Sequence, residues 1–469
     1  MSRRYLIETF GCQMNYHDSE QMAGLLEAAG YERTADDRDA DVVVINTCSV
    51  REHAEEKLYT RLGELRVRAR ESGRDPIVAV AGCVAQQEGA ALLERAPIVD
   101  VIVGTRRGRL LPVLVEQARE THAAQVDLGA HDNVAFPFGL TRRDDPVRAR
   151  VTIIDGCNEY CSFCVVPYTR GHERMRPKRE ILAEVRGAAA RGLREVQLLG
   201  QIVNHYQAPD DPACDFAGLL EAVHETPGIE RIRFASPHPR YVSDRLIGAL
   251  RDLPKVCRHL HLPVQSGSTT VLQRMRRRYT RESYLDLVAR LRAEVPGIAL
   301  STDMIVGFPG EAAEDFDETL SLTATVRYHS MFSFKYSERP NTLASKRYPD
   351  AVPETEKTRR IVALQSLQRE VQQRLHQEAV GTTVDVLADA ISRRRSWELS
   401  GRTGGNTVVN FPGRPEWIGR VIRVRITRAN PNSLSGQAAV VPGDVALSPR
   451  WRPDAGQAGA AHGPAGPQR

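Results

Sequence analysis

Three cysteines crowd into the segment DGCNEYCSFC, which runs from Asp155 to Cys164. Cys157, Cys161 and Cys164, here called the central trio, supply three thiols, and no fourth cysteine follows in step. A tetrahedral zinc site needs four ligands, so a distant residue such as His172 would have to complete it. A 4Fe-4S cluster on three thiolates instead keeps one iron open for a small molecule. The spacing alone leaves both interpretations open.

A second set of thiols is spread over the first hundred residues. Cys12, Cys48 and Cys83, here called the N-terminal trio, each close an apolar run: LIETFGC, VVVINTC and VAVAGC. Because the carboxyl ends of parallel strands line one crevice, we expect the three thiols to meet there. We predict a second cluster with an open iron, and chance placement in a strand-rich domain is the alternative. Cys214 and Cys257 stand alone and are predicted to be buried small hydrophobic residues.

The bulk composition narrows the class of protein. A chain of 469 residues predicts roughly three domains, and eight cysteines are too sparse for a disulfide framework. The first residues, MSRRYLIETFGC, lack the pattern of a secretory signal. No apolar run approaches the ~18 residues that cross a bilayer. We therefore expect a cytoplasmic protein that does not bind membranes.

Periodicity divides the chain into domains. Residues 1–119 alternate strand-like runs with amphipathic helices, which predicts an open parallel α/β domain. Residues 120–147 lose periodicity and are predicted to be a linker. In residues 148–377, six strand candidates follow at helix-separated intervals: RVTIID, EVQLLG, RIRFAS, HLHLPVQ, ALSTDMIVG and SMFSFKYS. Six units rather than eight predict a partial (β/α)6 barrel with its site at the carboxyl ends of the strands.

The last part of the chain changes character. Residues 378–446 contain short alternating runs broken by Gly, Asn and Pro, which predicts a small β-barrel. Nine arginines against five acidic residues give its stretch 381–446 a net charge of +4, nearly all of the chain's +5. This charge predicts contacts with an RNA backbone, although a solvated arginine-rich face is the alternative. The run 276–278 is interpreted as a solvated helix end, and the tail 447–469 is predicted to be disordered.

A C-x3-C-x2-C run directly after the first strand of a six-strand β/α domain resembles the radical S-adenosylmethionine superfamily. The resemblance implies that the open iron binds S-adenosylmethionine and that one electron splits it to a 5′-deoxyadenosyl radical. It also implies contacts between the cofactor and Phe163, which lies between Cys161 and Cys164. The segments LLGQ, LPVQSGS and DMIVGFPGE resemble the superfamily's cofactor-facing strand ends, which implies further cofactor contacts by Gly200, Gln201, Gln265 and Ile305.

Two cysteine trios followed by a C-terminal β module resemble the methylthiotransferases, which insert sulfur and a methyl group at an unreactive C–H bond. The resemblance implies two 4Fe-4S clusters, with one S-adenosylmethionine as methyl donor and another as radical source. The C-terminal module resembles the TRAM domain. Its segment SGRTGGNTVVNF implies RNA contacts by Arg402 and Asn406, to which we add Arg393 and Arg394.

Local sequence narrows the substrate. The segments NTCSVREHAEEKLYTRLG, CNEYCSFCVVPYTRGHE and LLGQIVNHY look like those of family members that modify carbon 2 of N6-dimethylallyladenosine beside the tRNA anticodon, although Met175 departs from their pattern. The implied partners are the anticodon stem-loop, an electron donor and a sulfur or cluster donor protein, and we expect a monomer. The alternatives are the same chemistry on threonylcarbamoyladenosine in tRNA or on a ribosomal-protein aspartate. A more distant alternative is a non-catalytic RNA-binding protein that holds zinc or an iron-sulfur cluster.

Overall fold

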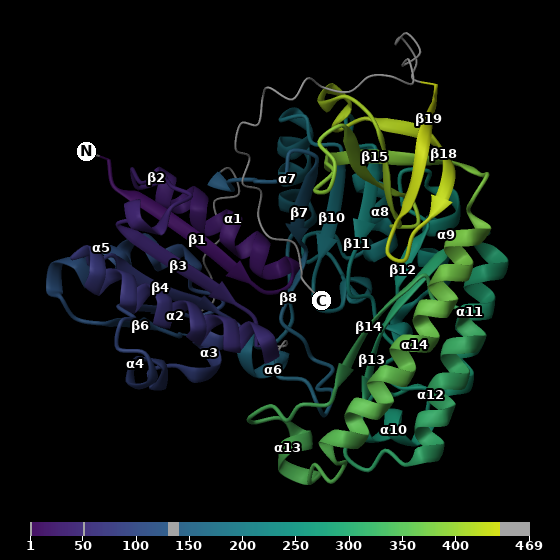
Figure 1. Ribbon diagram of the computed structural model, residues 1–469, viewed down its shortest axis with the longest axis horizontal. Helices are drawn as coiled ribbons and strands as arrows, with labels where there is room; N and C mark the ends of the chain where they lie inside the picture. Colours follow the sequence, from purple (N-terminus) through teal and green to yellow (C-terminus); the bar gives the residue numbers. More distant parts are fainter. Residues whose placement is uncertain (1, 50–51, 130–139, 441–469) are drawn as a thin grey trace.

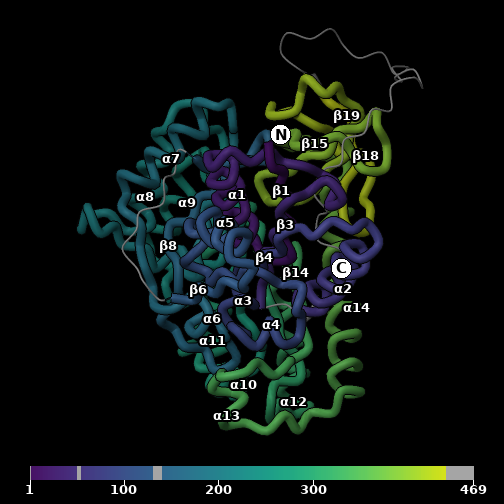
Figure 2. Tube along the Cα trace, turned by 90° about the vertical axis from the view of Figure 1, so that its left-hand side faces the viewer, coloured from purple at the N-terminus to yellow at the C-terminus, as the bar shows by residue number. Residues whose placement is uncertain are grey.

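The computed structural model describes residues 2–49, 52–129 and 140–440, and the predicted tail 447–469 lies outside them. Figure 1 shows an N-terminal α/β domain beside a central domain, with a small barrel (β15 to β19) at one end of the molecule. Helices α10, α12 and α13 mark the other end, and Figure 2 shows the same arrangement from the side. Among the described helices, none is long and apolar enough to cross a membrane.

The N-terminal domain is a parallel sheet with the strand order β2-β1-β3-β4-β5-β6. Its strands are β1 (Arg4–Phe10), β2 (Glu32–Arg33), β3 (Val42–Thr47), β4 (Ile77–Gly82), β5 (Val101–Val103) and β6 (Gln125–Asp127). Its helices are α1 (Gln13–Ala28), α2 (Glu52–Ser72), α3 (Cys83–Glu88), α4 (Ala91–Arg95) and α5 (Leu111–Thr121), with 3-10 turns at Asp37–Asp39 and Gly108–Leu110.

Two hydrophobic cores hold this sheet between its helices. On one face, α1 and α5 cover side chains such as Val42 and Val44. On the other, α2 and α4 cover Val43 and Ile45. The central strands are therefore buried on both faces, as their continuous apolar runs require.

The end of the N-terminal domain differs from the sequence-based boundary at residue 119. Strand β6 (Gln125–Asp127) pairs in parallel with β5 as the sixth strand of the sheet, inside the segment interpreted as a linker. Three residues are too few to show a period of two, and none of them is fully buried. The strand could be recognised only from its pairing.

The central domain contains the six predicted strands, and all of them run in parallel. They are β7 (Arg148–Thr152), β10 (Glu195–Leu199), β11 (Arg231–Phe234), β12 (His259–His261), β13 (Ala299–Val306) and β14 (Ser330–Lys335). They form two three-stranded groups, β7-β10-β11 and β12-β13-β14, which a parallel bridge between Ile232 and Val256 joins. Among the described pairings none links β7 to β14, so the barrel is open on one side as expected.

Helices cover the outside of this partial barrel. They are α6 (Val166–Thr169), α7 (Lys178–Ala190), α8 (Phe216–His224), α9 (Asp244–Asp252), α10 (Thr269–Arg274), α11 (Arg281–Glu294), α12 (Ala313–Val326), α13 (Leu343–Arg347) and α14 (Glu354–Glu378). The short strands β8 (Ile154–Asp155) and β9 (Arg174–Met175) pair around the central trio, and 3-10 turns lie at Val203–His205 and Pro239–Tyr241.

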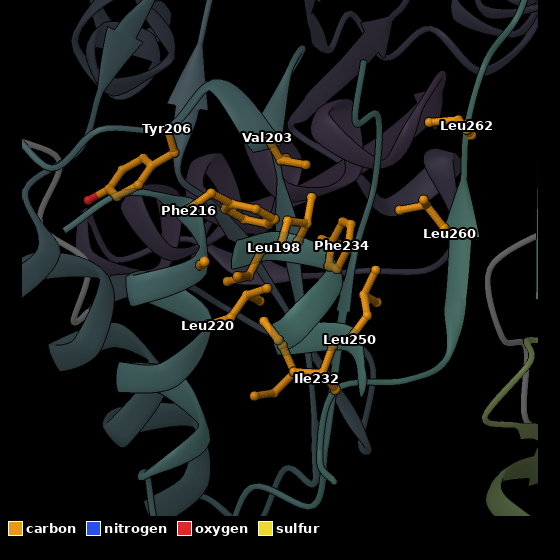
Figure 3. Close-up of a cluster of buried hydrophobic side chains, with 14 of the residues drawn as sticks. Leu198, Val203, Tyr206, Phe216, Leu220, Ile232, Phe234, Leu250, Leu260 and Leu262 are labelled. Carbon is orange, nitrogen blue, oxygen red and sulfur yellow. The ribbon is translucent and has the colours of Figure 1, made fainter. Parts of the chain in front are cut away.

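One continuous core joins the strands of the central domain to these helices. Figure 3 shows part of it, where Leu198 and Ile232 from the strands meet Phe216 and Leu220 from α8. Cys214 belongs to this core and Cys257 is also buried, which confirms their prediction as small hydrophobic residues.

The C-terminal domain is a closed five-stranded barrel in the order β15-β16-β17-β19-β18, as predicted. Its elements are β15 (Thr383–Ile391), β16 (Glu398–Thr403), β17 (Val408–Pro412), a 3-10 turn at Pro415–Trp417, β18 (Val421–Ala429) and β19 (Leu434–Val440). Arg231 and Arg233, near the start of β11, donate hydrogen bonds to the backbone carbonyls of Arg402 (2.5 Å) and Thr403 (2.5 Å). The barrel therefore docks at the amino ends of the central strands, opposite the carboxyl ends where the loops carry chemistry.

Gly82 lies at a tightly packed strand end of the N-terminal domain, which a substitution can test. Its φ of +92° lies in the left-handed region, and an added Cβ would stand 2.3 Å from Asn46 Oδ1 and 2.5 Å from the Thr47 carbonyl. We expect Gly82→Ala to lower the free energy of unfolding by about 2–4 kcal/mol, measured by urea denaturation. Gly63→Ala is the matched control, because Gly63 lies inside α2 with no atom near its Cβ position, and it should stabilise by up to about 1 kcal/mol.

Candidate active site

The order of the strands brings the N-terminal trio together. Cys12 caps α1 after β1, Cys48 follows β3, and Cys83 opens α3 after β4. Strands β1, β3 and β4 are neighbours in the sheet. From β1 the sheet grows in both directions, with β2 on one side and β3 on the other. The crevice between β1 and β3 is therefore a topological switch point, which is where open parallel sheets bind ligands.

Hydrogen bonds link the three thiols. Cys48 interacts with both Cys12 and Cys83, which lowers the pKa of Cys12 to about 6 and that of Cys83 to about 7. The pKa of Cys48 itself is raised, because its protonated form makes the hydrogen bonds with Cys12 and Cys83. The backbone N–H groups of Met14 and Asn15 at the start of α1 also donate to Cys12 and lower its pKa. Two of the three sulfurs thus favour the thiolate form, the form that binds iron.

A buried arginine from the central domain faces this trio. Arg170 is 4% exposed and pairs with Asp18 of α1 (2.7 Å) and with Asp155 of β8 (3.0 Å). After the hydrogen bond to Cys48, its positive charge is the largest favourable contribution to the lowered pKa values of Cys12 and Cys83. Sequence reasoning missed this residue, because a single arginine in VVPYTRGHE carries no signal of its own.

The central trio lies in the loop between β8 and α6. Gly156, with a φ of +85°, starts the loop where an added Cβ would stand 2.2 Å from the His172 carbonyl. The backbone of Cys157 donates to Gly171, and that of Cys164 to Cys161. Burial, with a smaller contribution from nearby Cys161, raises the pKa values of Cys157 and Cys164 to about 12. These thiols therefore release their protons only when a metal centre replaces them.

A second buried arginine touches this trio. Arg277 donates from Nη1 to Sγ of Cys161 at 3.4 Å and from Nη2 to the Pro263 carbonyl at 3.0 Å. Only 6% of Arg277 is exposed, so its interpretation as part of a solvated helix end was wrong. The sequence of three consecutive arginines, 276–278, does not reveal that the middle side chain is buried.

His172, the fourth ligand of the zinc interpretation, is exposed and directs Nδ1 to Asn158 Oδ1 (3.2 Å) and Tyr160 Oη (3.3 Å). In the described part of the chain, no three His, Cys, Asp or Glu side chains converge as ligands of one metal ion. A 4Fe-4S cluster makes a different demand, because its thiolates bind separate irons. The chemistry of both trios, three sulfurs beside a buried guanidinium, fits such a cluster.

The predicted cofactor residues gather near the central trio. Phe163 and Ile305 pack against the same small apolar cluster, which includes Met275 and Phe308. Gln265 adopts the left-handed φ of +74° and exchanges backbone hydrogen bonds with β13, one of them from Ile305. A bulky residue in this region of backbone space is uncommon and marks a functional candidate. Gly200 packs against Ile154, at the end of β10.

Gln201 of the central domain reaches the N-terminal domain. Its Nε2 lies 2.9 Å from Sδ of Met14, two residues after Cys12, while its Oε1 is buried and has no hydrogen-bond partner in the described structure. Arg170 and Asp18 connect the same two domains at 2.7 Å, and His17 reaches Thr152 at 2.7 Å. Both trios therefore border one inter-domain region, which Figure 1 shows between α3 and α6.

The predicted RNA residues separate into two groups. Arg393 and Arg394 lie exposed in the β15–β16 hairpin. Arg402 donates to Asn406, and burial at the contact with the central domain lowers its pKa. The loop of Arg402 and Asn406 thus docks the barrel rather than facing outward. Sequence similarity identified this loop but could not show that the central domain covers it.

Comparisons with known proteins decide the family. Residues 4–104 match an uncharacterized protein family (UPF0004), residues 151–323 the radical SAM superfamily and residues 377–439 the TRAM domain. The tRNA-2-methylthio-N(6)-dimethylallyladenosine synthase of Chromobacterium violaceum is 46% identical over 93% of this chain and 98% of its own. That of Geobacter metallireducens is 46% identical over 92% and 98%. The chain belongs to the tRNA-2-methylthio-N6-dimethylallyladenosine synthases.

Solved structures agree with the fold of these synthases. The radical S-adenosylmethionine methyltransferase TsrM from Kitasatospora setae is similar over 74% of each chain, with a TM-score of 0.52 and 16% identity. Membership of the radical SAM superfamily implies S-adenosylmethionine and one 4Fe-4S cluster in this synthase.

Arg170 provides a test of the N-terminal trio. Arg170→Gln removes the charge that favours two thiolates and the ion pairs with Asp18 and Asp155, of which Asp155 keeps its pair with Arg106. We expect reconstituted protein to fall from about eight iron atoms per chain toward about four, measured by iron and sulfide analysis. Arg106→Gln, which removes another guanidinium from Asp155, is the control and should keep the higher count. Equal losses in both variants would assign the effect to Asp155 rather than to the thiols.

Proposed function

We propose that this protein replaces the hydrogen at carbon 2 of N6-dimethylallyladenosine, next to the anticodon of tRNA, with a methylthio group. The observation that carries the proposal is the meeting of both cysteine trios at one inter-domain region, in a chain of the synthase family. The hydrogen at carbon 2 is neither acidic nor attached to a leaving group, so acid–base residues alone could not exchange it.

The central trio is the proposed anchor of the first 4Fe-4S cluster. With S-adenosylmethionine bound, this cluster supplies the radical that removes the hydrogen. Arg277 offsets the negative charge of the three thiolates through its contact with Cys161. Phe163 and Ile305 provide an apolar wall for the adenine of the cofactor, and the fixed backbone of Gln265 positions Ile305.

The N-terminal trio is the proposed anchor of a second 4Fe-4S cluster, which supplies the sulfur to be transferred. Support comes from three thiols at neighbouring strand ends, their mutual hydrogen bonds and the buried charge of Arg170. Arg170 is held by a carboxylate from each domain, so the guanidinium that favours the thiolates also links the two domains.

The inner face of the barrel suits a prenylated base. Leu300 and Met304 of β13 point to the outer core, so Asp303 and Ile305 point inward. In the paired strand β14, Phe332 lies opposite Asp303 and Phe334 opposite Ile305. Both rings are exposed for residues of their size, and Phe332 lies with its ring edge-on to His261. An apolar surface beside the proposed cofactor residues matches the dimethylallyl group.

The outer face of β18 is the proposed contact for the RNA backbone. Alternate residues Ile422, Val424 and Ile426 fill the barrel core, so Arg423 and Arg425 are exposed on the other side. Exposed arginines before and after them extend the row, and we call this set the β18 stripe: Arg420, Arg423, Arg425 and Arg428. Such a row fits phosphates, and Arg393 and Arg394 add charge in the hairpin that follows β15.

The proposed reaction can be tested with anticodon stem-loops. Reconstituted protein should convert a stem-loop that carries N6-dimethylallyladenosine to its 2-methylthio form, measured by nucleoside mass spectrometry. Unmodified and threonylcarbamoyladenosine stem-loops, and a ribosomal protein, should stay unchanged. Cys161→Ala should abolish cleavage of S-adenosylmethionine, because the radical site is lost. Cys48→Ala should spare cleavage but stop methylthiolation.

The two cysteine variants serve as controls for each other. Loss of both activities in a folded Cys48→Ala protein would contradict the division of labour between the trios. Methylthiolation of the threonylcarbamoyl substrate at the same rate would overturn the substrate assignment.

The β18 stripe predicts salt-dependent binding. Arg423→Gln with Arg425→Gln should raise the Kd for the stem-loop about tenfold at low salt and reduce the slope of log K against log salt by about 1–2. Arg66→Gln with Arg70→Gln removes the same charge from exposed positions of α2 and is the matched control. An equal effect of both pairs would show that only net charge matters.

A further inference from the structure

A pocket of about 300 Å³ opens beside the loop of the central trio. It lies between the segments that follow β10 and β11, at the carboxyl ends of the strands. Tyr206 and Phe216 line it and also belong to the main core, where Figure 3 shows both side chains. Its more polar lining includes Asn204, His205, Gln207, Asp215, Arg240 and Tyr241. Neither the cysteine trios nor the proposed cofactor residues account for this pocket.

Flat side chains dominate the wall of the pocket. The rings of His205 and Tyr241 stack with centroids 4.4 Å apart and planes inclined by 29°. The guanidinium of Arg240 lies 5.4 Å from the centroid of Tyr241. Proteins hold unpaired RNA bases by stacking them on aromatic rings and on guanidinium planes.

The charges of the pocket favour a base over a phosphate. His205 Nδ1 lies 2.9 Å from Glu173 Oε2, and Arg240 lies 3.6 Å from Glu159 Oε1. Tyr241 donates its hydroxyl hydrogen to the same Glu159. Asp215 adds another carboxylate. Each positive group already has an acidic neighbour, so the π surfaces remain as the feature that a ligand can use.

The same contacts tie the pocket to the reaction centre. Glu159 lies between Cys157 and Cys161 in the sequence. Glu173 lies directly before β9, which pairs with β8 next to the central trio. His205 belongs to the segment LLGQIVNHY, whose sequence looks like that of the tRNA-modifying members. We propose that this pocket binds an unpaired base of the anticodon loop, next to the adenosine that is modified, by adding to the stacked ring pair of His205 and Tyr241, in which the His205 side chain is 41% exposed. The proposal rests on the proposed function and extends it to a second nucleotide.

Abasic stem-loops test the pocket. Tyr241→Leu should raise the Kd of the holoenzyme for the prenylated stem-loop about tenfold, as expected for one lost base stack. Tyr241→Phe keeps the ring and should stay within about twofold. In the wild type, removal of one base beside the target should cost the same tenfold. That removal should cost Tyr241→Leu nothing more, because the interaction is already lost.

Controls separate the pocket from its neighbours. Cleavage of S-adenosylmethionine without RNA should be unchanged in Tyr241→Leu, and His205→Leu should repeat its binding defect if the first variant folds poorly. Additive losses at every abasic position would overturn the proposal, as would equal defects in Tyr241→Phe and Tyr241→Leu. A lowered salt slope without an abasic effect would assign a phosphate contact instead. A wild type that leaves the prenylated stem-loop unmodified would refute the proposed function itself.

Discussion

The buried guanidinium of Arg170 is the constraint on which the rest of the site depends. It comes from the central domain, yet it pairs with Asp18 of the N-terminal domain and influences Cys12 and Cys83. Removal of one partner from a buried ion pair leaves the other charge uncompensated, so Arg170 and Asp18 depend on each other across the domain boundary. The Arg170 side chain thus lowers the pKa values of two thiols and also links the two domains.

The two halves of the site use the same architectural rule. In the N-terminal sheet and in the partial barrel, chemistry lies at the carboxyl ends of parallel strands, where loops and not side-chain packing determine the residues. The strands themselves are buried by helices, which makes the strand ends rigid. The strand ends of both sheets border one inter-domain region, and no described pairing closes the barrel between β7 and β14.

Sequence alone predicted the parts of the fold that repeat. Continuous apolar runs marked the inner strands, and the expectation that Cys12, Cys48 and Cys83 meet agrees with their mutual hydrogen bonds. Their role as cluster ligands stays a prediction. Strand β6 was missed because three partly buried residues show no period. Arg277 was misread, since the left-handed turns at Arg276 and Arg278 that direct it inward leave no trace in a run of three arginines. Arg402 matched a known loop, but whether a loop faces solvent depends on which domain covers it.

The docking of the small barrel has a consequence for what can be a substrate. Its strands sit at the amino ends of the central barrel, whereas the cysteines occupy the opposite ends. A molecule that engages both must therefore reach along the whole height of the central domain. In the proposed function, a free nucleoside is too short to contact both ends, whereas a folded RNA is long enough.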